Sequence, residues 1–475
     1  MPELTPGLRA RLAAIAGPGR LLTDPADCWP YGYDNSRRHA LPQAVVFAAA
    51  DDQVPDQLAG LVRLCVEAGL PLIARGRGTG TTGATVPDRG GVVLSFERMN
   101  RILRIAPGDR YVVCEPGVVN ADLQRAIGAH GFFWPPDPTS AAVCTIGGNL
   151  AYNSAGPRAV KYGTPREHTL GLKAITGRGE RIHTGVLTTK GVVGYDLTRL
   201  IIGSEGTLAL ISEATLKLTP LPEATRTLRA AYRDIHSAAA AVSAIMAQPI
   251  TPCALEFMDA AAIATVRAYS GLDLPDATGA LLMIEVDGPA ACVDSAVTAV
   301  EAAADNAGLL DCRHAADPAE VAALWKTRKA LSPALRHIAP KKINEDVVVP
   351  VSRLGAFIDG LERLSREQGI RIVNFGHAGN GNIHVNLLVN PDDPVELARA
   401  HGCLDAVFAL VLGLGGTLSG EHGVGLEKRD FVAREIDAPT LRLMADLKQC
   451  CDPAGILNPG KALPISGVSA MVVFP

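Results

Sequence analysis

Three glycine-rich loops in the first half of the chain constrain its fold more than any other feature. The first is Arg75-Gly76-Arg77-Gly78-Thr79-Gly80-Thr81-Thr82-Gly83, the second spans residues 145–156, and the third is Gly203-Ser204-Glu205-Gly206. Because glycine has no Cβ atom, backbone N–H groups in such loops can approach an anion closely. Three of these loops in one α/β region predict a long, phosphate-bearing cofactor held largely by backbone. For the first loop, a flexible surface segment is the alternative.

The first loop contains a formal Gly-x-Gly-x-x-Gly pattern at Gly78, Gly80 and Gly83. In a nicotinamide-binding Rossmann unit this pattern opens a helix whose N-terminus faces the pyrophosphate. Residues 84–91 follow it here, and with Pro87 and two further glycines they cannot sustain a helix. The sequence therefore argues against a nicotinamide-binding Rossmann unit.

Apolar periodicity predicts alternating strands and helices along most of the chain. In the first half we expect strands at 44–48, 71–74, 92–95, 102–105 and 111–115, helices at 54–66 and 120–129, and β-rich segments at 170–176 and 206–218. In the second half we expect helices at 236–247, 289–307, 317–337, 354–368 and 439–450, with strands at 280–286, 372–375 and 383–389. The paired prolines Pro220 and Pro222 indicate a linker. The predicted segments are an N-terminal helical segment at 1–40, a cofactor domain at 41–220, an α+β substrate domain with an antiparallel sheet at 221–430, and a C-terminal segment at 431–475.

Charge and composition exclude several classes of protein. The 475 residues include 45 Lys+Arg against 49 Asp+Glu, a net charge of −4, which argues against a nucleic-acid partner. No apolar run reaches the roughly 18 residues of a transmembrane segment, and Arg9 and Arg11 interrupt any signal-peptide core. Ten cysteines without a Cys-x-x-Cys pattern indicate free thiols in a reducing compartment. We expect a cytoplasmic protein, with a peripheral position at the inner face of the membrane as the alternative.

Histidines in residues 374–386 predict metal chemistry. Asn380-Gly381 predicts a two-residue hairpin turn that places His377 directly opposite His384, where two imidazoles can chelate one divalent ion. Glu421, beside His422, offers a third ligand, and two His with one Glu suit Zn²⁺, Mn²⁺ or Fe²⁺. The alternatives are structural histidines and, for Glu421, a charge at the start of a helix expected at 426–436.

Together these segments resemble the flavin-binding vanillyl-alcohol oxidase/p-cresol methylhydroxylase superfamily. Within it they resemble the FAD-dependent D-2-hydroxyacid dehydrogenases, which include glycolate oxidase flavin subunits, cytochrome-type D-lactate dehydrogenases and D-2-hydroxyglutarate dehydrogenases. The resemblance covers residues 40 to 462 and implies an α+β fold, with a two-part FAD-binding domain and a substrate domain. The implied FAD-binding residues are Arg75, Gly76, Arg77, Gly78, Thr79, Gly80, Thr81, Pro136, Asp137, Thr139, Ser140, Gly147, Gly148, Asn153, Gly156, Gly163 and Gly206. Some members attach flavin covalently to a His or Cys of the first loop; none stands between Ile73 and Pro87, so we expect noncovalent FAD.

The resemblance also implies roles in the second half. It makes His377, His384 and Glu421 the metal ligands and places Asn386 and His422 at the substrate. Trp325-Lys326-Thr327-Arg328 resembles the family segment whose arginine binds the substrate carboxylate, a role that suits a planar guanidinium. Ser332, with Lys341 or Lys342, could add further polar contacts. An exposed helix arginine is the alternative for Arg328. Asn380 departs from the family, in which many members carry Asp.

The implied reaction oxidises a D-2-hydroxy acid of the D-lactate or glycolate type to the 2-oxo acid. Arg328 and the metal would hold the substrate, His422 would act as general base, and a hydride would pass to flavin N5. Without an iron–sulfur or haem motif, the reduced flavin needs an external acceptor such as a quinone, a cytochrome or an electron-transfer flavoprotein. Two alternatives are a D-2-hydroxyglutarate dehydrogenase, in which Ser332 with Lys341 or Lys342 would meet a second carboxylate, and a non-catalytic flavin-binding electron-transfer subunit. A homodimer is compatible with the sequence.

Overall fold

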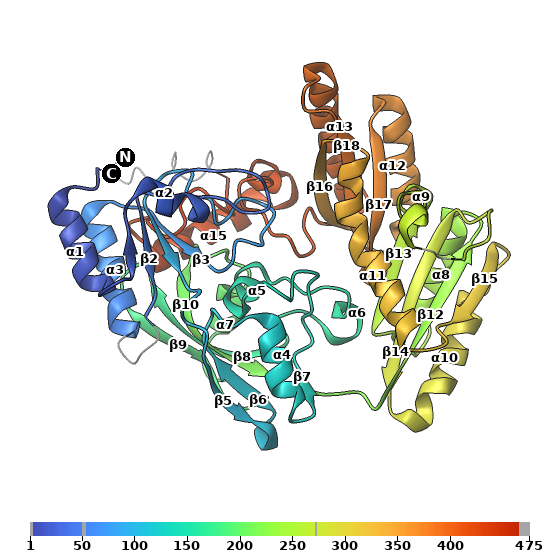
Figure 1. Cartoon of the computed structure of the whole chain (residues 1–475), viewed down its shortest axis with the longest axis horizontal. Helices are drawn as coiled ribbons and strands as arrows, with labels where there is room; N and C mark the ends of the chain where they lie inside the picture. Colours follow the sequence, from blue (N-terminus) through green and yellow to red (C-terminus); the bar gives the residue numbers. More distant parts are fainter. Residues whose placement is uncertain (1–2, 50–53, 271–272, 465–475) are drawn as a thin grey trace. The chain divides into compact units, whose positions relative to one another are not determined.

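The computed structural model describes residues 3–49, 54–270 and 273–464, and the chain divides into two compact units (Figure 1). The first unit comprises Met1–Ala155, Gly163–Leu221 and Glu421–Pro475, and the second comprises Gly156–Tyr162 and Pro222–Gly420. The predicted domain boundaries, at 41–220, 221–430 and 431–475, stay predictions. The two compact units have different bounds, because residues 156–162 belong to the second unit and residues 421–430 to the first.

A small parallel sheet opens the first unit. Strands β2 (Ala44–Phe47), β4 (Val92–Ser95) and β3 (Leu72–Arg75) pair in parallel, and β1 (Leu21–Leu22) pairs antiparallel with β2. β2 and β4 are buried along their whole length, as expected for parallel strands covered on both faces. Helix α3 (Val54–Ala68) precedes β3 and ends at Gly69, whose φ of +62° favours glycine.

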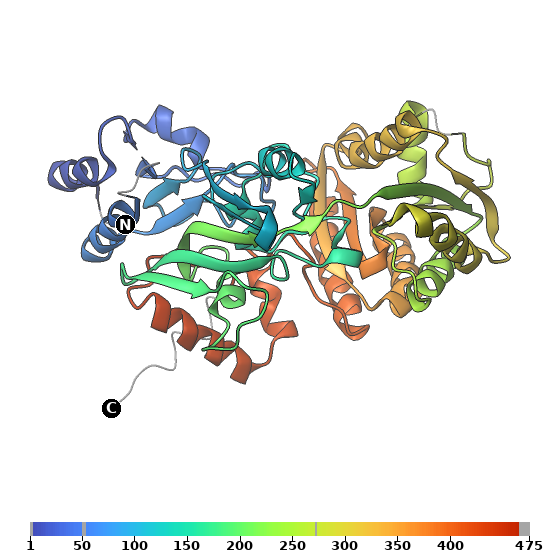
Figure 2. The ribbon, with the colours of Figure 1, turned by 90° about the horizontal axis from the view of Figure 1, so that it is seen from below.

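The second sheet of the first unit is antiparallel, with the order β5-β6-β10-β8-β9. Its core is formed by apolar side chains of the sheet and of α4 (Asn120–Gly128) and α5 (Ile146–Tyr152), around the fully buried Trp134. Helix α15 (Ala438–Cys451) joins this unit, because Lys448 Nζ donates to the carbonyl of Thr207 at 2.7 Å (Figure 2). The five strands are β5 (Ile102–Ala106), β6 (Tyr111–Cys114), β10 (Ala209–Lys217), β8 (Thr169–Thr176) and β9 (Arg181–Gly185).

The second unit is built on a seven-stranded antiparallel sheet with the order β15-β12-β14-β13-β17-β18-β16. Helices cover both of its faces (Figure 2). On one face, Met258 and Phe375 pack with α9 (Ala260–Ser270) and α11 (Pro318–Ala334). On the other, the Tyr232 hydroxyl donates to the carbonyl of Ala304 in α10 (Ala290–Ala304). The strands are β12 (Ala224–Tyr232), β13 (Ala254–Asp259), β14 (Ala280–Gly288), β15 (Leu309–His314), β16 (Lys341–Val348), β17 (Arg371–His377) and β18 (Asn382–Val389).

A short segment from the first half of the sequence belongs to the second unit. Helix α6 (Ala159–Tyr162) contacts β13. Lys161 Nζ lies 2.5 Å from Oδ1 of Asp287, and the Tyr162 hydroxyl lies 2.8 Å from Oδ2 of the same residue. The Asp287 side chain is fully buried, so these two contacts compensate its charge.

Most of the expected elements are confirmed. Helices α3, α4, α8 (Ile235–Ala247), α12 (Leu354–Gln368) and α15 form where periodicity predicts them, and the second half has the predicted antiparallel sheet. Residues 76–91, all of them described, contain no helix, which confirms that the Gly-x-Gly-x-x-Gly match does not open a Rossmann helix. The helix expected at 426–436 is wrong, because only a 3₁₀ turn at Arg429–Phe431 and the four-residue α14 (Val432–Glu435) form there. Among the described residues, none of the helices has the length and hydropathy needed to cross a bilayer.

Candidate active site

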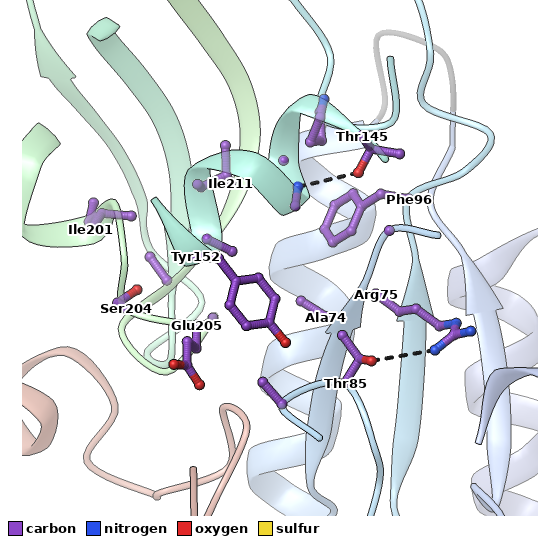
Figure 3. Close-up of a pocket in the computed structure, with 18 residues that line it drawn as sticks. Ala74, Arg75, Thr85, Phe96, Thr145, Tyr152, Ile201, Ser204, Glu205 and Ile211 are labelled. Atoms are coloured by element: carbon purple, nitrogen blue, oxygen red, sulfur yellow. Dashed lines mark hydrogen bonds between the residues drawn. The ribbon is translucent and has the colours of Figure 1, made fainter. Parts of the chain in front are cut away.

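The first unit contains a pocket whose empty space, including the part open to solvent, is about 630 Å³ (Figure 3). It lies where the end of β3, the start of α5 and the loop before β10 meet. Its walls are mostly apolar or glycine. The lining residues are Ala74, Arg75, Gly76, Ala84, Thr85, Phe96, Pro116, Thr145, Gly147, Gly148, Ala151, Tyr152, Ile201, Ser204, Glu205, Gly206, Ala209 and Ile211. Glycines from all three predicted glycine-rich loops therefore meet at one cavity.

Two of these glycines are required by close packing. A Cβ atom on Gly76 would lie 2.4 Å from Oγ1 of Thr145, and one on Gly147 would lie 2.6 Å from Cβ of Pro116. The same Thr145 hydroxyl caps α5 by accepting the N–H of Gly148 at 3.2 Å. The backbone of two loops is thus exposed to the cavity without side chains in the way, which suits a long ligand held by main-chain groups.

Tyr152 and Glu205 are two of the polar side chains among these walls. Figure 3 shows the Tyr152 ring in the middle of the lining residues, with its hydroxyl toward Ala74 and Thr85. That hydroxyl is buried beside Thr82 and Ala84 and makes no hydrogen bond of normal geometry to the described residues, so it can serve a bound molecule. Glu205 is buried and has a φ of +53°, an unusual value for a residue with a side chain. Burial raises the pKa of Glu205 to about 6, although the N–H groups of Val424 and Gly425 act against the rise.

Five of the predicted FAD-binding residues line this cavity: Arg75, Gly76, Gly147, Gly148 and Gly206. The guanidinium of Arg75 is occupied by structural contacts, because it donates to the carbonyls of Tyr33 at 2.6 Å and Pro30 at 3.3 Å. The other predicted residues are all described, but they are not among those that line the cavity: Arg77, Gly78, Thr79, Gly80, Thr81, Pro136, Asp137, Thr139, Ser140, Asn153, Gly156 and Gly163. Tyr152 and Glu205 were missed, since neither residue type suggested a cofactor contact.

In the second unit, β17 and β18 bring His377 and His384 together, with ring centroids 5.2 Å apart. The predicted register is wrong by two residues. His377 pairs with Asn382 and His384 pairs with Phe375, because a four-residue loop at 378–381 replaces the expected two-residue turn. Gly381 takes the left-handed conformation in this loop, with a φ of +70°, and a Cβ there would meet the carbonyl oxygen of Val349. Because side chains alternate with period two, a shift of two keeps both histidines on one face.

Glu421 completes a three-residue group with these histidines. One potential ligand atom from each of His377, His384 and Glu421 lies within 4.8 Å of the others, and no other group of three or more such residues was found in the described chain. Glu421 is joined by one peptide bond to Gly420, the last residue of the second unit. Asp346, a fully buried residue of β16, accepts the N–H of Gly420 at 3.0 Å and the hydroxyl of Ser419 at 3.2 Å. Two nitrogens and one carboxylate fit a divalent transition metal.

A buried carboxylate that the sequence analysis missed lies behind His377. Glu256 on β13 is paired in register with His377 and is 1% exposed. Its Oε1 lies 2.5 Å from Nδ1 of His377, and its Oε2 accepts the Nε–H of Arg328 at 2.7 Å. Burial acts to raise the pKa of Glu256, but the charges of His377 and Arg328 and their hydrogen bonds outweigh it and hold that pKa below its usual value.

The predicted substrate residues lie on α11, β16 and β18. Arg328 is buried on α11, with its guanidinium 4.9 Å from the ring centroid of Phe375, so the exposed-helix alternative is excluded. Lys342 Nζ lies 2.5 Å from the hydroxyl oxygen of Ser332. The Asn386 amide donates to the carbonyls of Val373 and His384, so this side chain braces the strands.

His422 directly follows Glu421 in the first unit. Its Nε2 lies 4.0 Å from a carboxylate oxygen of Glu421, and its carbonyl accepts the Thr82 hydroxyl at 3.3 Å. The second contact ties the residue to the first glycine-rich loop, which follows β3.

Two family models match the chain. One described as "FAD binding domain" matches residues 42–185, and one described as "FAD linked oxidases, C-terminal domain" matches residues 221–462. The fold agrees with a solved structure of p-cresol methylhydroxylase with substrate bound, at a TM-score of 0.77 and 18% identity, over 97% of this chain and 98% of that one. The expected two-part flavin-binding fold is thereby confirmed.

Relatives match most of the length of the chain. A protein named "Glycolate oxidase subunit GlcD" from Bacillus subtilis (strain 168) is 36% identical over 459 residues, 96% of this chain and 97% of the relative. A "D-2-hydroxyglutarate dehydrogenase" from Stutzerimonas stutzeri (strain A1501) is 33% identical over 466 residues, 96% and 98% of the two chains. A "D-lactate dehydrogenase" from Anaerostipes hadrus is 33% identical over 432 residues, 89% and 90% of the two chains.

Proposed function

Because the chain belongs to the FAD-linked oxidase family, we propose that it oxidises a D-2-hydroxy acid, of the D-lactate or glycolate type, to the corresponding 2-oxo acid. The observation that carries the proposal is the grouping of His377, His384 and Glu421, whose potential ligand atoms lie within 4.8 Å of one another. Apolar side chains would stabilise the fold at a lower cost in free energy, because buried imidazoles and carboxylates lose their hydration. The names of the relatives support the class of substrate.

When bound, FAD supplies an acceptor for the hydride from C2, and a divalent ion lowers the pKa of the substrate hydroxyl. The cavity of the first unit would hold FAD noncovalently, since Gly76, Gly147, Gly148 and Gly206 leave backbone groups accessible there. His377, His384 and Glu421 would hold the ion. These donors fit Zn²⁺, Mn²⁺ or Fe²⁺ by chemistry and number.

Two side chains of this protein would act directly on the substrate. Arg328 would bind the carboxylate through its terminal Nη groups, because its Nε–H already donates to Glu256. His422 would take the proton of the hydroxyl as general base, the role that histidine side chains fill most often. Asn386 would contribute a fixed amide next to His384. An external acceptor, such as a quinone, a cytochrome or an electron-transfer flavoprotein, would reoxidise the reduced flavin. We propose that the protein acts in the cytoplasm.

A specific contact keeps D-2-hydroxyglutarate as a second candidate substrate. Lys342 and Ser332 lie together on β16 and α11, with Nζ and Oγ 2.5 Å apart. A cation next to a hydroxyl is the chemistry that a second carboxylate would require.

The test is anaerobic reduction of the purified flavoprotein. We expect D-lactate, glycolate or D-2-hydroxyglutarate to bleach the flavin absorbance within seconds, and L-lactate and L-2-hydroxyglutarate to leave it unchanged. The His377→Ala variant, as the control, should bind flavin but should not bleach. Flavin that stays oxidised with all three acids would contradict the proposal and would favour a non-catalytic electron-transfer subunit.

A further inference from the structure

We propose that Glu256 is a positioning residue that orients both the metal ligand His377 and the carboxylate-binding Arg328. The inference rests on the proposed function for the roles of those two residues. One carboxylate reaches both of them, through Oε1 to Nδ1 of His377 at 2.5 Å and through Oε2 to Nε of Arg328 at 2.7 Å.

The bond to Glu256 fixes the tautomer of His377. An ionised carboxylate has only acceptors, so the hydrogen in the bond to Glu256 has to reside on Nδ1 of the imidazole. The ring then presents Nε2 to a metal. A carboxylate behind a metal-binding histidine also raises the basicity of the ligand and fixes the ring plane. His377 is buried at the end of β17, where its register partner on β13 is Glu256 itself.

Glu256 also helps to fix the orientation of Arg328. Its guanidinium lies 4.9 Å from the centroid of the Phe375 ring, and its Nε–H is taken by Glu256. These two contacts fix the plane of the guanidinium group and leave its terminal Nη groups available to bind the substrate carboxylate. Because both oxygens of Glu256 are engaged, any movement of His377 is transmitted to Arg328. The ion and the substrate carboxylate would therefore be held in a fixed relation.

Glu285 provides a matched control in the same unit. It lies on the neighbouring strand β14, is also buried, and also binds α11, because its Oε1 accepts the Nε1–H of Trp325 at 2.7 Å. The Thr227 hydroxyl is its other donor, at 3.0 Å. Glu285→Gln therefore perturbs a buried carboxylate and the docking of α11 while leaving the pair of contacts at Glu256 in place.

The experiment compares Glu256→Gln with Glu285→Gln in the flavin-loaded protein. Zinc affinity is measured by competition with a chelator, and KM and kcat are measured with the acid that bleaches the flavin. For Glu256→Gln we expect zinc affinity to fall about 10- to 100-fold, with a raised KM. For Glu285→Gln we expect the zinc affinity and the KM to stay within about twofold of the wild-type values. Equal losses in the two variants, or unchanged zinc affinity in Glu256→Gln, would overturn the proposal.

A second measurement needs no variant at position 256. In zinc-loaded wild-type protein labelled with ¹⁵N-histidine, the His377 resonance, identified by its loss in His377→Ala, should show hydrogen on Nδ1 and none on Nε2. The reverse pattern would overturn the proposal even if Glu256→Gln fails to fold. Failure of the proposed oxidation is distinguishable, because zinc affinity and the imidazole pattern are read without substrate.

Discussion

The carboxylate of Glu205 accepts the backbone N–H of Val424 at 2.6 Å, although the two residues are 219 positions apart in the sequence. It also accepts the N–H of Gly425, at 2.8 Å. Both contacts lie in the first unit, and they tie the segment that follows Glu421 and His422 to the loop that lines the cavity. Glu205 therefore holds the segment that carries the proposed general base.

The raised pKa of Glu205 predicts a pH-dependent stability. Its pKa is about 6 in the folded protein, mainly because of burial, against an ordinary value of 4.5. Between those values the folded state keeps a proton that the unfolded state has lost, so the free energy of unfolding falls as the pH rises from 4.5 to 6. The contribution is about 2 kcal/mol. Urea unfolding of the cofactor-free protein measures the free energy of unfolding of the wild type and of Glu205→Gln. The difference between the two proteins should change by this amount as the pH rises through this range. A difference that does not depend on pH would contradict the raised pKa of Glu205.

Removal of a metal ligand should separate metal binding from flavin binding. His377→Ala should lose the bound metal and lower kcat by more than about 100-fold, because even outer partners of a metal ligand cost 10- to 100-fold. Its flavin absorbance should remain, since the cavity lies in the other unit. The control is His401→Ala, an exposed histidine of α13 (Pro394–Gly413). Metal content per flavin, measured by mass spectrometry, checks the prediction; equal metal in both variants would count against it.

Neighbouring lysines of β16 test the second-carboxylate site. Lys342→Met should lower kcat/KM for D-2-hydroxyglutarate about 10- to 100-fold, because a hydrogen bond to a charged group is lost. It should leave D-lactate unaffected. Lys341→Met is the matched control, since successive side chains of a strand point to opposite faces. A selective loss in Lys341→Met instead would move the site to the other face of the sheet.

The buried hydroxyl of Tyr152 predicts opposite effects on the empty and the loaded protein. Because the hydroxyl makes no hydrogen bond of normal geometry to the described residues, Tyr152→Phe should stabilise the cofactor-free protein by about 1 kcal/mol. The same change should weaken FAD binding by roughly fivefold, if the hydroxyl bonds the cofactor. Tyr162→Phe, which loses the bond to Asp287, should instead destabilise the protein and leave FAD affinity unchanged. Thermal melts and flavin titration measure both; unchanged FAD affinity in Tyr152→Phe would exclude the contact.

Local patterns predicted many of the helices, although not α9 and α13, and the grouping of the proposed metal ligands, but not the register that joins the two histidines. The two histidines share a face because the error of two residues at the hairpin preserves the alternation of side chains. The turn itself depends on a glycine conformation imposed by the approach of Val349, which is remote in sequence. Such contacts are absent from any local window of residues.

The strands β13 and β16 escaped prediction for a different reason. Both carry charged residues on a buried face, such as Glu256 and Asp346, so their hydrophobic pattern is broken. Each of these carboxylates is compensated by groups from elsewhere: Arg328 comes from α11, and Gly420 from the end of the unit. The residues that break the pattern are therefore those that support the candidate site.

A C-terminal fragment of the protein, cut at the linker, should not fold stably by itself. A cut at the proline-rich linker would give a C-terminal piece that begins at Pro222 and lacks Lys161 and Tyr162, the two residues that contact the fully buried Asp287. That piece would have to bury a bare carboxylate or unfold around it. The second unit therefore cannot be exchanged between relatives as residues 222–420 alone. A chimaera must take residues 156–162 from the same relative.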